Sequence, residues 1–200
     1  MAKRSDAKHR MVQAAQQLIR ERGYHATAIS DVLERSAAPR GSVYFHFPGG
    51  KAQLAMDAAG AHAHQQVQLI DHAAEQASSA EELIQAYLDL ARVGMVDSGY
   101  SRGCGIAPLV IEAEPGEREA GELAATSRRS FSAMIDRLAF HLIDFGLDPA
   151  PARQLADAVI AAVEGALITS RALRTPSPFD AVREIMTSQA AALTPPGARP

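Results

Sequence analysis

The sequence predicts an all-α protein, and three observations point to this class. Ala, Leu, Gln, Glu and Arg, which favour helices, recur through the 200 residues, whereas Trp is absent and aromatic residues make up only 5%. Apolar residues return at three- and four-residue steps in one segment after another. No run alternates apolar and polar residues, which is the pattern of a half-buried strand. Helices separated by short breaks are therefore expected along the whole chain.

The first two helices are marked by their ends. The segment from Ser5 to Arg22 has an apolar face, and Gly23 provides a C-terminal stop. Thr27 or Ser30 can cap the next helix with a side-chain oxygen. We expect that helix to end near Ser36.

A short helix and a long one follow the turn Ala37-Ala38-Pro39. Pro39 is expected at the start of the short helix, because the first helical position has no use for an N–H group. Arg40 to Phe47 forms this helix, and Pro48-Gly49-Gly50 ends it. Lys51 then opens a long helix that runs to about Gln76.

The rest of the chain is predicted to be helical, with Gly- and Pro-rich breaks between the segments. Residues 97–105 form a Gly-rich loop, and residues 195–200 are predicted to be a disordered tail. The helical segments are expected at residues 80–96, 106–112, 117–145, 149 or 151 to 173, and 179–193.

Two short helices joined by so short a turn, near residues 27–47, form a helix-turn-helix, whose second helix enters a DNA major groove. Such a helix needs a small residue where its backbone approaches DNA, and hydrogen-bond donors where it meets bases and phosphates. Gly41 allows close approach, Arg40 can reach a guanine edge or a phosphate, and Ser42 can reach a base or backbone oxygen.

The neighbouring side chains have more than one interpretation. Tyr44 and His46 can donate to phosphates, although Tyr44 can also be a core aromatic and His46 a surface histidine. Phe45 can meet a thymine methyl group or a sugar. Val43 and Phe47 are expected in the core of the three-helix unit.

The distribution of charge supports a nucleic-acid partner, although the net charge of −3 alone argues against one. Residues 1–55 hold nine Lys or Arg and four Asp or Glu, a net charge of +5, and include all three lysines. Residues 56–200 hold eleven basic and nineteen acidic residues, a net charge of −8. This asymmetry indicates that one end of the chain meets a polyanion. A merely solvated basic face is the alternative.

The stretch Thr27 to Lys51 resembles the reading head of TetR-type transcriptional regulators. The matching positions are Thr27, Val32, Gly41, Tyr44, His46, Phe47 and Lys51. The resemblance implies that Tyr44, His46 and Lys51 mainly contact the DNA backbone. Lys51 also lies at a helix N-terminus, where free N–H groups favour a phosphate. Thr27 can likewise present its hydroxyl or N–H group to the backbone.

The stretch departs from the family pattern at the turn. Leu33 stands where a small Ala is usual, and Ser36-Ala37-Ala38 replaces the common Ala-Gly-Val. Without the glycine, the residue at the turn must accommodate its backbone in another way. Pro39 replaces a common Ser cap, which removes one possible phosphate contact. We expect these changes to alter operator choice more than the fold.

Three downstream motifs resemble one branch of the TetR family. They are residues Gly103 to Ala113, Pro48-Gly49-Gly50-Lys51 and Glu164-Gly165-Ala166-Leu167. The branch contains lincomycin-resistance and flavonoid-responsive repressors with an LmrA/YxaF-like C-terminal domain. The resemblance implies a pocket inside the C-terminal helices and release from DNA when an apolar or aromatic molecule binds.

Candidate pocket residues are apolar side chains that can equally be plain core, and a pocket between helices suits such a ligand. They are Tyr87, Met95, Ile106, Leu109, Phe131, Met134, Ile135, Leu138 and Val163.

A homodimer is expected, because two reading heads must reach successive major grooves of a near-palindromic operator. Two C-terminal helices carry small and apolar residues that suit packing against a partner. The candidate interface residues are Ala156, Val159, Ile160, Gly165, Leu167, Val182 and Met186.

The expected division is therefore a helix-turn-helix DNA-binding domain at 1–50, a larger helical ligand-binding and dimerisation domain at 51–194, and the tail. No cofactor, metal site or membrane span is expected, and a cytoplasmic protein is the simplest interpretation. His62, His64 and His72 do not share a helix face, and Cys104 is a single cysteine between glycines, either a small packing residue or a thiol sensor. An enzyme using Cys104 with a histidine, and a helical binding protein whose head no longer reads DNA, are the alternatives to a ligand-responsive repressor.

Overall fold

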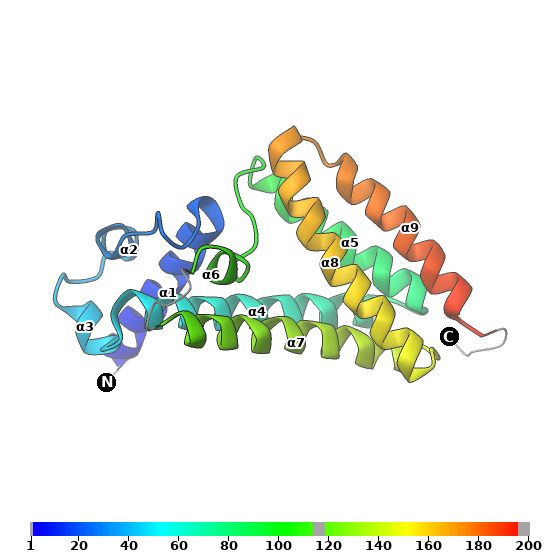
Figure 1. Cartoon of the computed structure of the whole chain (residues 1–200), viewed down its shortest axis with the longest axis horizontal. Helices are drawn as coiled ribbons and strands as arrows, with labels where there is room; N and C mark the ends of the chain where they lie inside the picture. The colour runs from blue at the N-terminus through cyan, green and yellow to red at the C-terminus, as the bar shows by residue number, and fades with distance from the viewer. Residues whose placement is uncertain (1, 114–118, 196–200) are drawn as a thin grey trace. The chain divides into compact units, whose positions relative to one another are not determined.

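The computed structural model describes residues 2–113 and 119–195, which form helices and loops with no strand among them (Figure 1). The all-α prediction is confirmed. The helices are α1 Ala2–Arg22, α2 Ile29–Ser36, α3 Ser42–His46, α4 Gly50–Gln76, α5 Ala80–Asp97, α6 Pro108–Ile111, α7 Ala120–Asp144, α8 Pro149–Leu173 and α9 Ser177–Leu193. No helix in this part of the chain is long and apolar enough to cross a membrane.

Most helix ends follow from local sequence. Gly23 ends α1 as predicted, with φ +89° and its N–H donating to the Ile19 carbonyl at 2.9 Å. Gly146 likewise ends α7, with φ +95°. Pro115-Gly116, in the break expected between residues 112 and 117, and the tail from residue 196 onward lie outside the described residues.

Two predictions about helix starts were wrong. The residue that caps α2 is Ala28, which has no side-chain oxygen, so neither Thr27 nor Ser30 serves as the cap. Pro39 lies outside α3, which begins at Ser42 with Gly41 as its cap. The Pro39 carbonyl instead accepts the Ser42 N–H at 2.9 Å, so proline forms the turn that leads into the helix.

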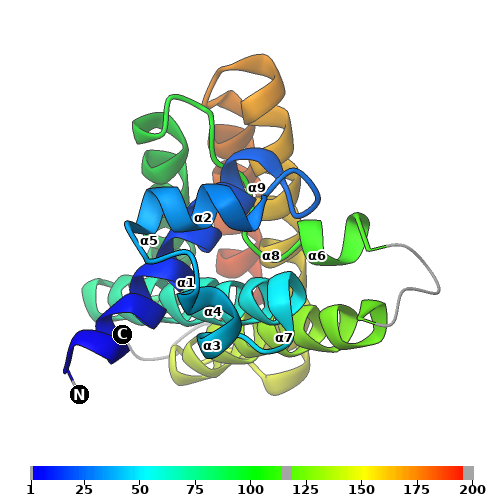
Figure 2. The same cartoon turned by 90° about the vertical axis from the view of Figure 1, so that its left-hand side faces the viewer.

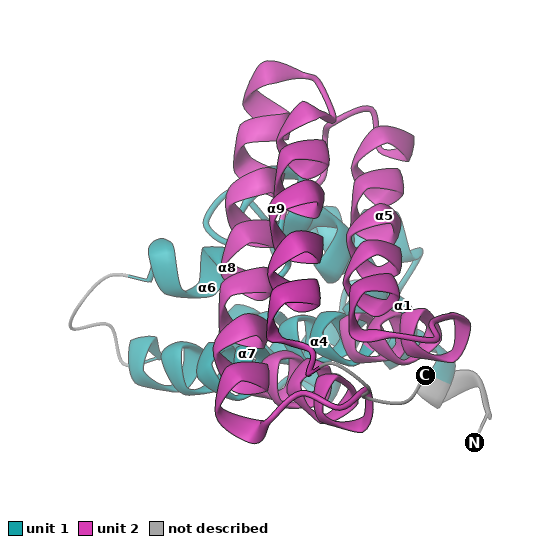
Figure 3. Cartoon of the chain, turned by 90° about the vertical axis from the view of Figure 1, so that its right-hand side faces the viewer, with its two compact units in different colours: residues 1–64, 104–131 teal, residues 65–103, 132–200 magenta. Residues whose placement is uncertain are grey.

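The chain divides into two compact units, coloured in Figure 3. Unit 1 comprises residues 1–64 and 104–131, and unit 2 comprises residues 65–103 and 132–200. Helices α4 and α7 each contribute residues to both units. The predicted functional boundary at residue 50 falls inside unit 1 and stays a prediction.

Unit 1 holds α1, α2, α3 and α6 with the first parts of α4 and α7. Figure 2 looks onto the head formed by α1, α2 and α3. Its core is built from fully buried apolar side chains on each of these elements and on α4. They include Met11, Leu18, Ile19, Val32, Val43, Phe47 and Leu54.

Unit 2 is centred on three helices that lie side by side, α5, α8 and α9 (Figure 3). Tyr87 and Phe179 are among its largest fully buried side chains. Two ion pairs join α5 to α9, Arg92 to Asp180 at 2.8 Å and Arg183 to Asp89 at 3.0 Å. All four side chains are partly exposed, so each pair contributes at most about 1 kcal/mol. Apolar burial therefore dominates the stability of this unit.

Within unit 2, Asp71 on α4 holds two side chains of α7. Its Oδ1 accepts hydrogen bonds from Arg137 and from Nε2 of His141, the latter at 2.8 Å. Burial by itself raises the pKa of Asp71, but the bonds and charges of Arg137 and His141 outweigh it, and the pKa is lowered below its ordinary value.

Candidate nucleic-acid interface

Helix α3 is a short element that is held on one side only. Val43 and Phe47 are fully buried, and the Phe47 N–H donates to the Val43 carbonyl at 2.7 Å. These two residues fix α3 to the head from beneath. The prediction that both belong to the core is confirmed.

The opposite side of α3 faces outward. Tyr44 is 67% exposed and Phe45 65% exposed, and Arg40 and Gly41 just before the helix are also exposed. We call these four residues the reading surface. Among the residues that the structure describes, Arg40 has no ion-pair or hydrogen-bond partner. An exposed arginine beside two exposed aromatic rings suits contact with phosphates and base edges.

The glycine of the reading surface is not required by the fold. Gly41 has φ −80° and ψ −7°, which any residue adopts. A Cβ placed on it would have no heavy atom within 4 Å. Space beside its backbone is therefore open in the free protein, where a DNA strand could approach closely.

The turn between α2 and α3 uses a left-handed residue other than glycine. Ala37 has φ 50° and ψ 35°, and its N–H donates to the Glu34 carbonyl at 3.2 Å. Nε of Arg10, on α1, donates to the Ser36 carbonyl at 3.0 Å. A long-range hydrogen bond thus supports the turn that lacks the family's usual glycine. Arg10 also pairs with Asp6 on its own helix.

A groove of about 650 Å³ lies beside the reading surface, between α1 and α3. We call it the α1–α3 groove. Its lining residues are Asp6, Ala7, Arg10, Ala37, Pro39, Gly41, Ser42, Phe45 and His46. Four predicted DNA-binding positions and two residues of the turn before them thus share one concave surface with α1.

Sequence reasoning did not single out Arg10 or Asp6. Their spacing of four residues on a predicted helix is the one signal that could have found them, because it predicts an ion pair on a common face. The contact of Arg10 with the turn joins residues 26 positions apart and has no local signature.

Three predicted DNA-binding side chains are engaged within the head. The Ser42 hydroxyl donates to the Pro39 carbonyl at 2.6 Å. Thr27 is 4% exposed, and its hydroxyl donates to the Gly23 carbonyl at 2.7 Å. These two hydroxyl groups support turns of the head, so their structural roles are clearer than any contact with DNA.

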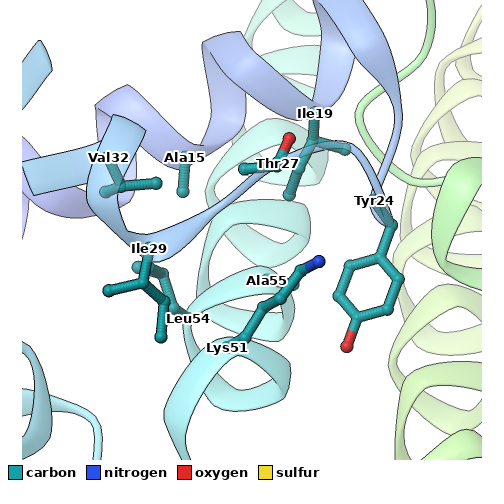
Figure 4. A pocket seen from close by; sticks show the side chains of 9 residues that line it. All are labelled: Ala15, Ile19, Tyr24, Thr27, Ile29, Val32, Lys51, Leu54 and Ala55. Atoms are coloured by element: carbon teal, nitrogen blue, oxygen red, sulfur yellow. The ribbon is translucent and has the colours of Figure 1, made fainter.

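Lys51, in the first turn of α4, is the third. Its ammonium group donates to the His25 carbonyl at 2.9 Å and lies 4.7 Å from the centre of the Tyr24 ring. Figure 4 shows Lys51 beside Tyr24 at a small cavity inside the head. That cavity measures about 10 Å³, which is room for one water at most.

Other basic residues of the head are paired with nearby acids. Arg22 pairs with Asp31 at 2.8 Å, and Arg35 pairs with Glu21 at 2.8 Å. Lys8 pairs with Asp57 at 3.1 Å. The positive charge of residues 1–55 is therefore partly compensated by these ion pairs.

The loop before α6 packs closely against α4 within unit 1. A Cβ on Gly105 would lie 2.9 Å from the His62 ring, so only glycine fits there. His62 is 5% exposed, and its Nδ1 lies 3.3 Å from Nε2 of Gln16. Burial, and to a lesser degree the charge of Arg20, lowers the pKa of His62 from 6.5 to about 3.

Cys104 is buried beside this glycine, and its sulfur accepts the N–H groups of Ile106 at 3.2 Å and Ala107 at 3.4 Å. This geometry fits the packing interpretation of Cys104. No group of three metal-ligating side chains is found in the described parts of the chain, the three histidines of α4 included.

The end of α6 contacts the head through Glu112. Its carboxylate accepts the His25 N–H at 2.7 Å, and its carbonyl accepts from Nε2 of His25. A Cβ on Gly23 would collide with the same carboxylate at 2.2 Å. The loop between α1 and α2 thus meets α6 closely.

The predicted pocket residues lie in both units. Ile106, Leu109 and Phe131 belong to unit 1, and the other six belong to unit 2. Seven are buried, while Phe131 and Ile135 are half-buried. The pocket itself stays a prediction.

The predicted dimer residues separate into two groups. Ala156, Val159 and Ile160 are at most 3% exposed in the single chain, so their side chains are already covered. The remaining four retain exposed surface; they are Gly165, Leu167, Val182 and Met186. Large apolar residues that sequence reasoning omitted are more exposed on the same helices, namely Ile168, Leu173 and Ile185.

Two known protein families match this chain, one in its N-terminal part and one in its C-terminal part. Residues 12–58 match the family described as bacterial regulatory proteins, tetR family. Residues 80–185 match the family described as transcriptional regulator LmrA/YxaF-like, C-terminal domain. The second match alone spans more than half of the chain.

Named relatives are transcriptional regulators rather than enzymes. The chain is 38% identical over 180 residues to a Mycobacterium tuberculosis protein named as an uncharacterized HTH-type transcriptional regulator, Rv0196, covering 88% of this chain and 89% of the relative. It is 25% identical over 174 residues to the HTH-type transcriptional regulator LmrA of Bacillus subtilis, covering 87% and 91%.

Solved structures show the same fold. A TetR transcriptional regulator from Legionella pneumophila matches with a TM-score of 0.79 at 22% identity, covering 92% of this chain and 96% of that one. The regulatory protein TetR from Rhodobacter sphaeroides matches with a TM-score of 0.78 at 21% identity, covering 92% and 98%. The chain therefore belongs to the TetR family of DNA-binding transcriptional regulators and carries a C-terminal domain of the LmrA/YxaF-like type.

Proposed function

We propose that this regulator binds a near-palindromic operator as a homodimer, represses transcription in the bacterial cytoplasm, and is released by a small apolar or aromatic molecule. The observation that carries the DNA part is the one-sided burial of α3. Val43 and Phe47 hold the helix from beneath, and the reading surface of Arg40, Gly41, Tyr44 and Phe45 lies opposite.

The contacts divide by chemistry. Arg40 is exposed and unpaired among the described residues, so its guanidinium group can bind a guanine edge or a phosphate without breaking an existing interaction. The exposed Tyr44 hydroxyl and the half-buried His46 ring supply further donors for phosphates. Lys51 acts at the DNA backbone only after its ammonium group leaves the His25 carbonyl, or through its charge from that position.

Operator binding tests this proposal directly. Double-stranded DNA enriched from a random pool by the wild-type protein serves as the probe, and affinity is measured by fluorescence anisotropy. Arg40→Ala and Tyr44→Ala should each weaken binding by roughly 10-fold or more, equal to about 1.4 kcal/mol. Arg128→Ala, which removes another exposed arginine, on α7, is the charge-matched control. Unchanged affinity in both head variants would contradict the assignment.

Salt dependence separates phosphate contacts from base contacts. Affinity for the operator should fall by about 0.9 log units per decade of salt for each phosphate that the protein neutralises. Tyr44→Phe, which removes only the hydroxyl donor, should weaken binding to specific and random DNA alike. A base-reading residue would change the ratio of the two affinities instead.

The dimer and effector parts of the proposal rest on unit 2. The exposed apolar residues of α8 and α9, Ile168 and Ile185 with the partly covered Leu167 and Val182, form a surface that suits a second copy of the chain. Sedimentation of the wild type against Ile168→Glu tests it: the wild type should be a dimer, and the variant should dissociate at micromolar concentration.

The effector site is proposed among α5, α7 and α8, where six of the predicted pocket residues lie. They are Tyr87, Met95, Met134, Ile135, Leu138 and Val163. A screen of small aromatic compounds for release of labelled operator DNA tests the response. An effector found in this way can shift the equilibrium only by its difference in affinity for the two states.

A further inference from the structure

Phe45 lies on the side of the reading helix opposite its buried residues. Each helical residue turns by about 100°, so the buried Val43 and Phe47 lie within about 40° of one another and Phe45 lies about 180° from their midpoint. The exposure of the Phe45 ring, 65%, agrees with that position. If α3 enters a major groove with its exposed side leading, the Phe45 side chain faces the base edges.

On the side of the α1–α3 groove, Phe45 is accompanied by a run of small and apolar turn residues, while Asp6 and Arg10 line the part of the groove that belongs to α1. Ala37, Pro39 and Gly41 line the groove with it, and the Ser42 hydroxyl that also lines it is turned back to the Pro39 carbonyl. The Phe45 and His46 rings form a T-shaped contact, with centroids 5.0 Å apart and planes at 86°. Phe45 therefore presents an apolar surface, with no hydrogen-bonding group at its tip.

A phenyl ring distinguishes base pairs chiefly through apolar contact, because N–H···π contacts with base amino groups are weak. The major-groove edges of the four base pairs carry hydrogen-bond donors and acceptors, and the 5-methyl group of thymine is their one apolar feature. An exposed phenylalanine gains little from the donors and acceptors, and it covers their hydration if it is placed against them. The ring is favoured where it meets a methyl group.

From this position and chemistry we infer that Phe45 reads the 5-methyl group of a pyrimidine, so that each operator half-site holds a thymine at one defined position. The inference rests on the proposed DNA-binding function and deepens it by naming a feature of the operator. A 5-methylcytosine at that position satisfies the same contact, whereas uracil and unmodified cytosine do not.

Thymine replacement in the selected operator measures the contact. Each thymine is replaced singly by deoxyuridine, symmetrically in both half-sites, which removes the methyl group and keeps every hydrogen-bonding group. Burial of one such group corresponds to about a 4-fold change in affinity per half-site, or about 15-fold for a symmetric dimer. One position should show this loss with the wild type. The remaining thymines should change affinity by less than 2-fold.

Variants of the head identify the side chain responsible. With Phe45→Ala, deoxyuridine and thymine at the sensitive position should bind equally, whereas Phe45→Leu should retain part of the preference. Arg40→Ala should weaken both DNAs by the same factor and keep the preference. Phe45 is exposed, so its replacement leaves the head folded, and circular dichroism of each variant checks this.

The outcomes distinguish the inference from the proposed function. Failure of the wild type to enrich any sequence counts against DNA recognition itself. If a palindrome is enriched and every thymine in it can be replaced without loss of affinity, the inference that a methyl group is recognised is overturned. DNA binding itself then stands, as expected if Phe45 contacts a sugar. An equal thymine preference in wild type and Phe45→Ala overturns the assignment to Phe45.

Discussion

The glycine of the reading surface provides a test in which stability and DNA affinity move in opposite directions. Gly41 caps α3 in an ordinary conformation, and a Cβ on it meets no heavy atom within 4 Å. Gly41→Ala should therefore stabilise the free protein by about 0.4–1 kcal/mol, because alanine restricts the unfolded chain more than glycine does. For a chain of this length the melting temperature rises by roughly 1–4 °C.

DNA binding should respond with a loss. The added methyl group occupies the space that is open in the free protein and that the proposed complex fills with DNA. Overpacking a close contact costs about 1–3 kcal/mol, which corresponds to about 5- to 150-fold in Kd. The loss should appear for operator and random DNA alike, because the contact is with the approaching backbone rather than a base.

The assay pairs thermal unfolding with fluorescence anisotropy on the selected operator at one fixed salt concentration. Gly60→Ala is the matched control, since Gly60 is exposed within α4 and a Cβ there also meets nothing within 4 Å. It should raise the melting temperature by a similar amount and leave Kd unchanged. A Gly41→Ala protein that is more stable and binds as tightly as the wild type would refute the reasoning.

Three further predictions address contacts within unit 1. Ala37→Gly should stabilise the protein by about 1 kcal/mol in thermal or urea unfolding, because glycine adopts the left-handed conformation without the Cβ penalty; a lower stability would show that the strain is absent. Arg10→Ala, which removes the bond to the Ser36 carbonyl, should cost about 1 kcal/mol and weaken operator binding, while Asp6→Asn, which keeps that bond, should not lower stability by more than a few tenths. The pKa of His62 is lowered from 6.5 to about 3 on folding, so the folded protein favours the neutral ring. The free energy of unfolding that this preference provides is fully present above pH 6.5 and is lost as the pH falls toward 3, with about 2 kcal/mol lost by pH 5. Urea unfolding at pH 8 and pH 5 should show this difference for the wild type and not for His62→Gln.

The sequence predicted the helices and the two sides of α3 because both depend on local periodicity. Val43 and Phe47 are four residues apart and were assigned to the core, and the exposure of Tyr44 follows from the same geometry. The motif also placed Thr27 and Lys51 in the right segment. It did not reveal that both side chains turn inward, since that depends on partners at Gly23 and His25 that only the folded loop provides.

The C-terminal helices show the same limit on a larger scale. A helix rich in small and apolar residues can pack against a partner chain or against its own neighbours, and periodicity does not distinguish these cases. In α8, Ala156, Val159 and Ile160 are covered within the chain, and the apolar surface that remains exposed includes Ile168 and Leu173. Their exposure depends on which face α5 and α9 occupy, which is a property of tertiary packing.

The backbone of His25 is held at two points. Its N–H is held by the Glu112 carboxylate at the end of α6, and its carbonyl is held by the Lys51 ammonium group at the start of α4. Two oppositely charged side chains, one at the end of α6 and one at the start of α4, thus bind the N–H and the carbonyl of one residue in the α1–α2 loop. The α1–α2 loop is therefore tied at one residue both to the end of α6 and to the start of α4, so that a change at either place bears on the same residue.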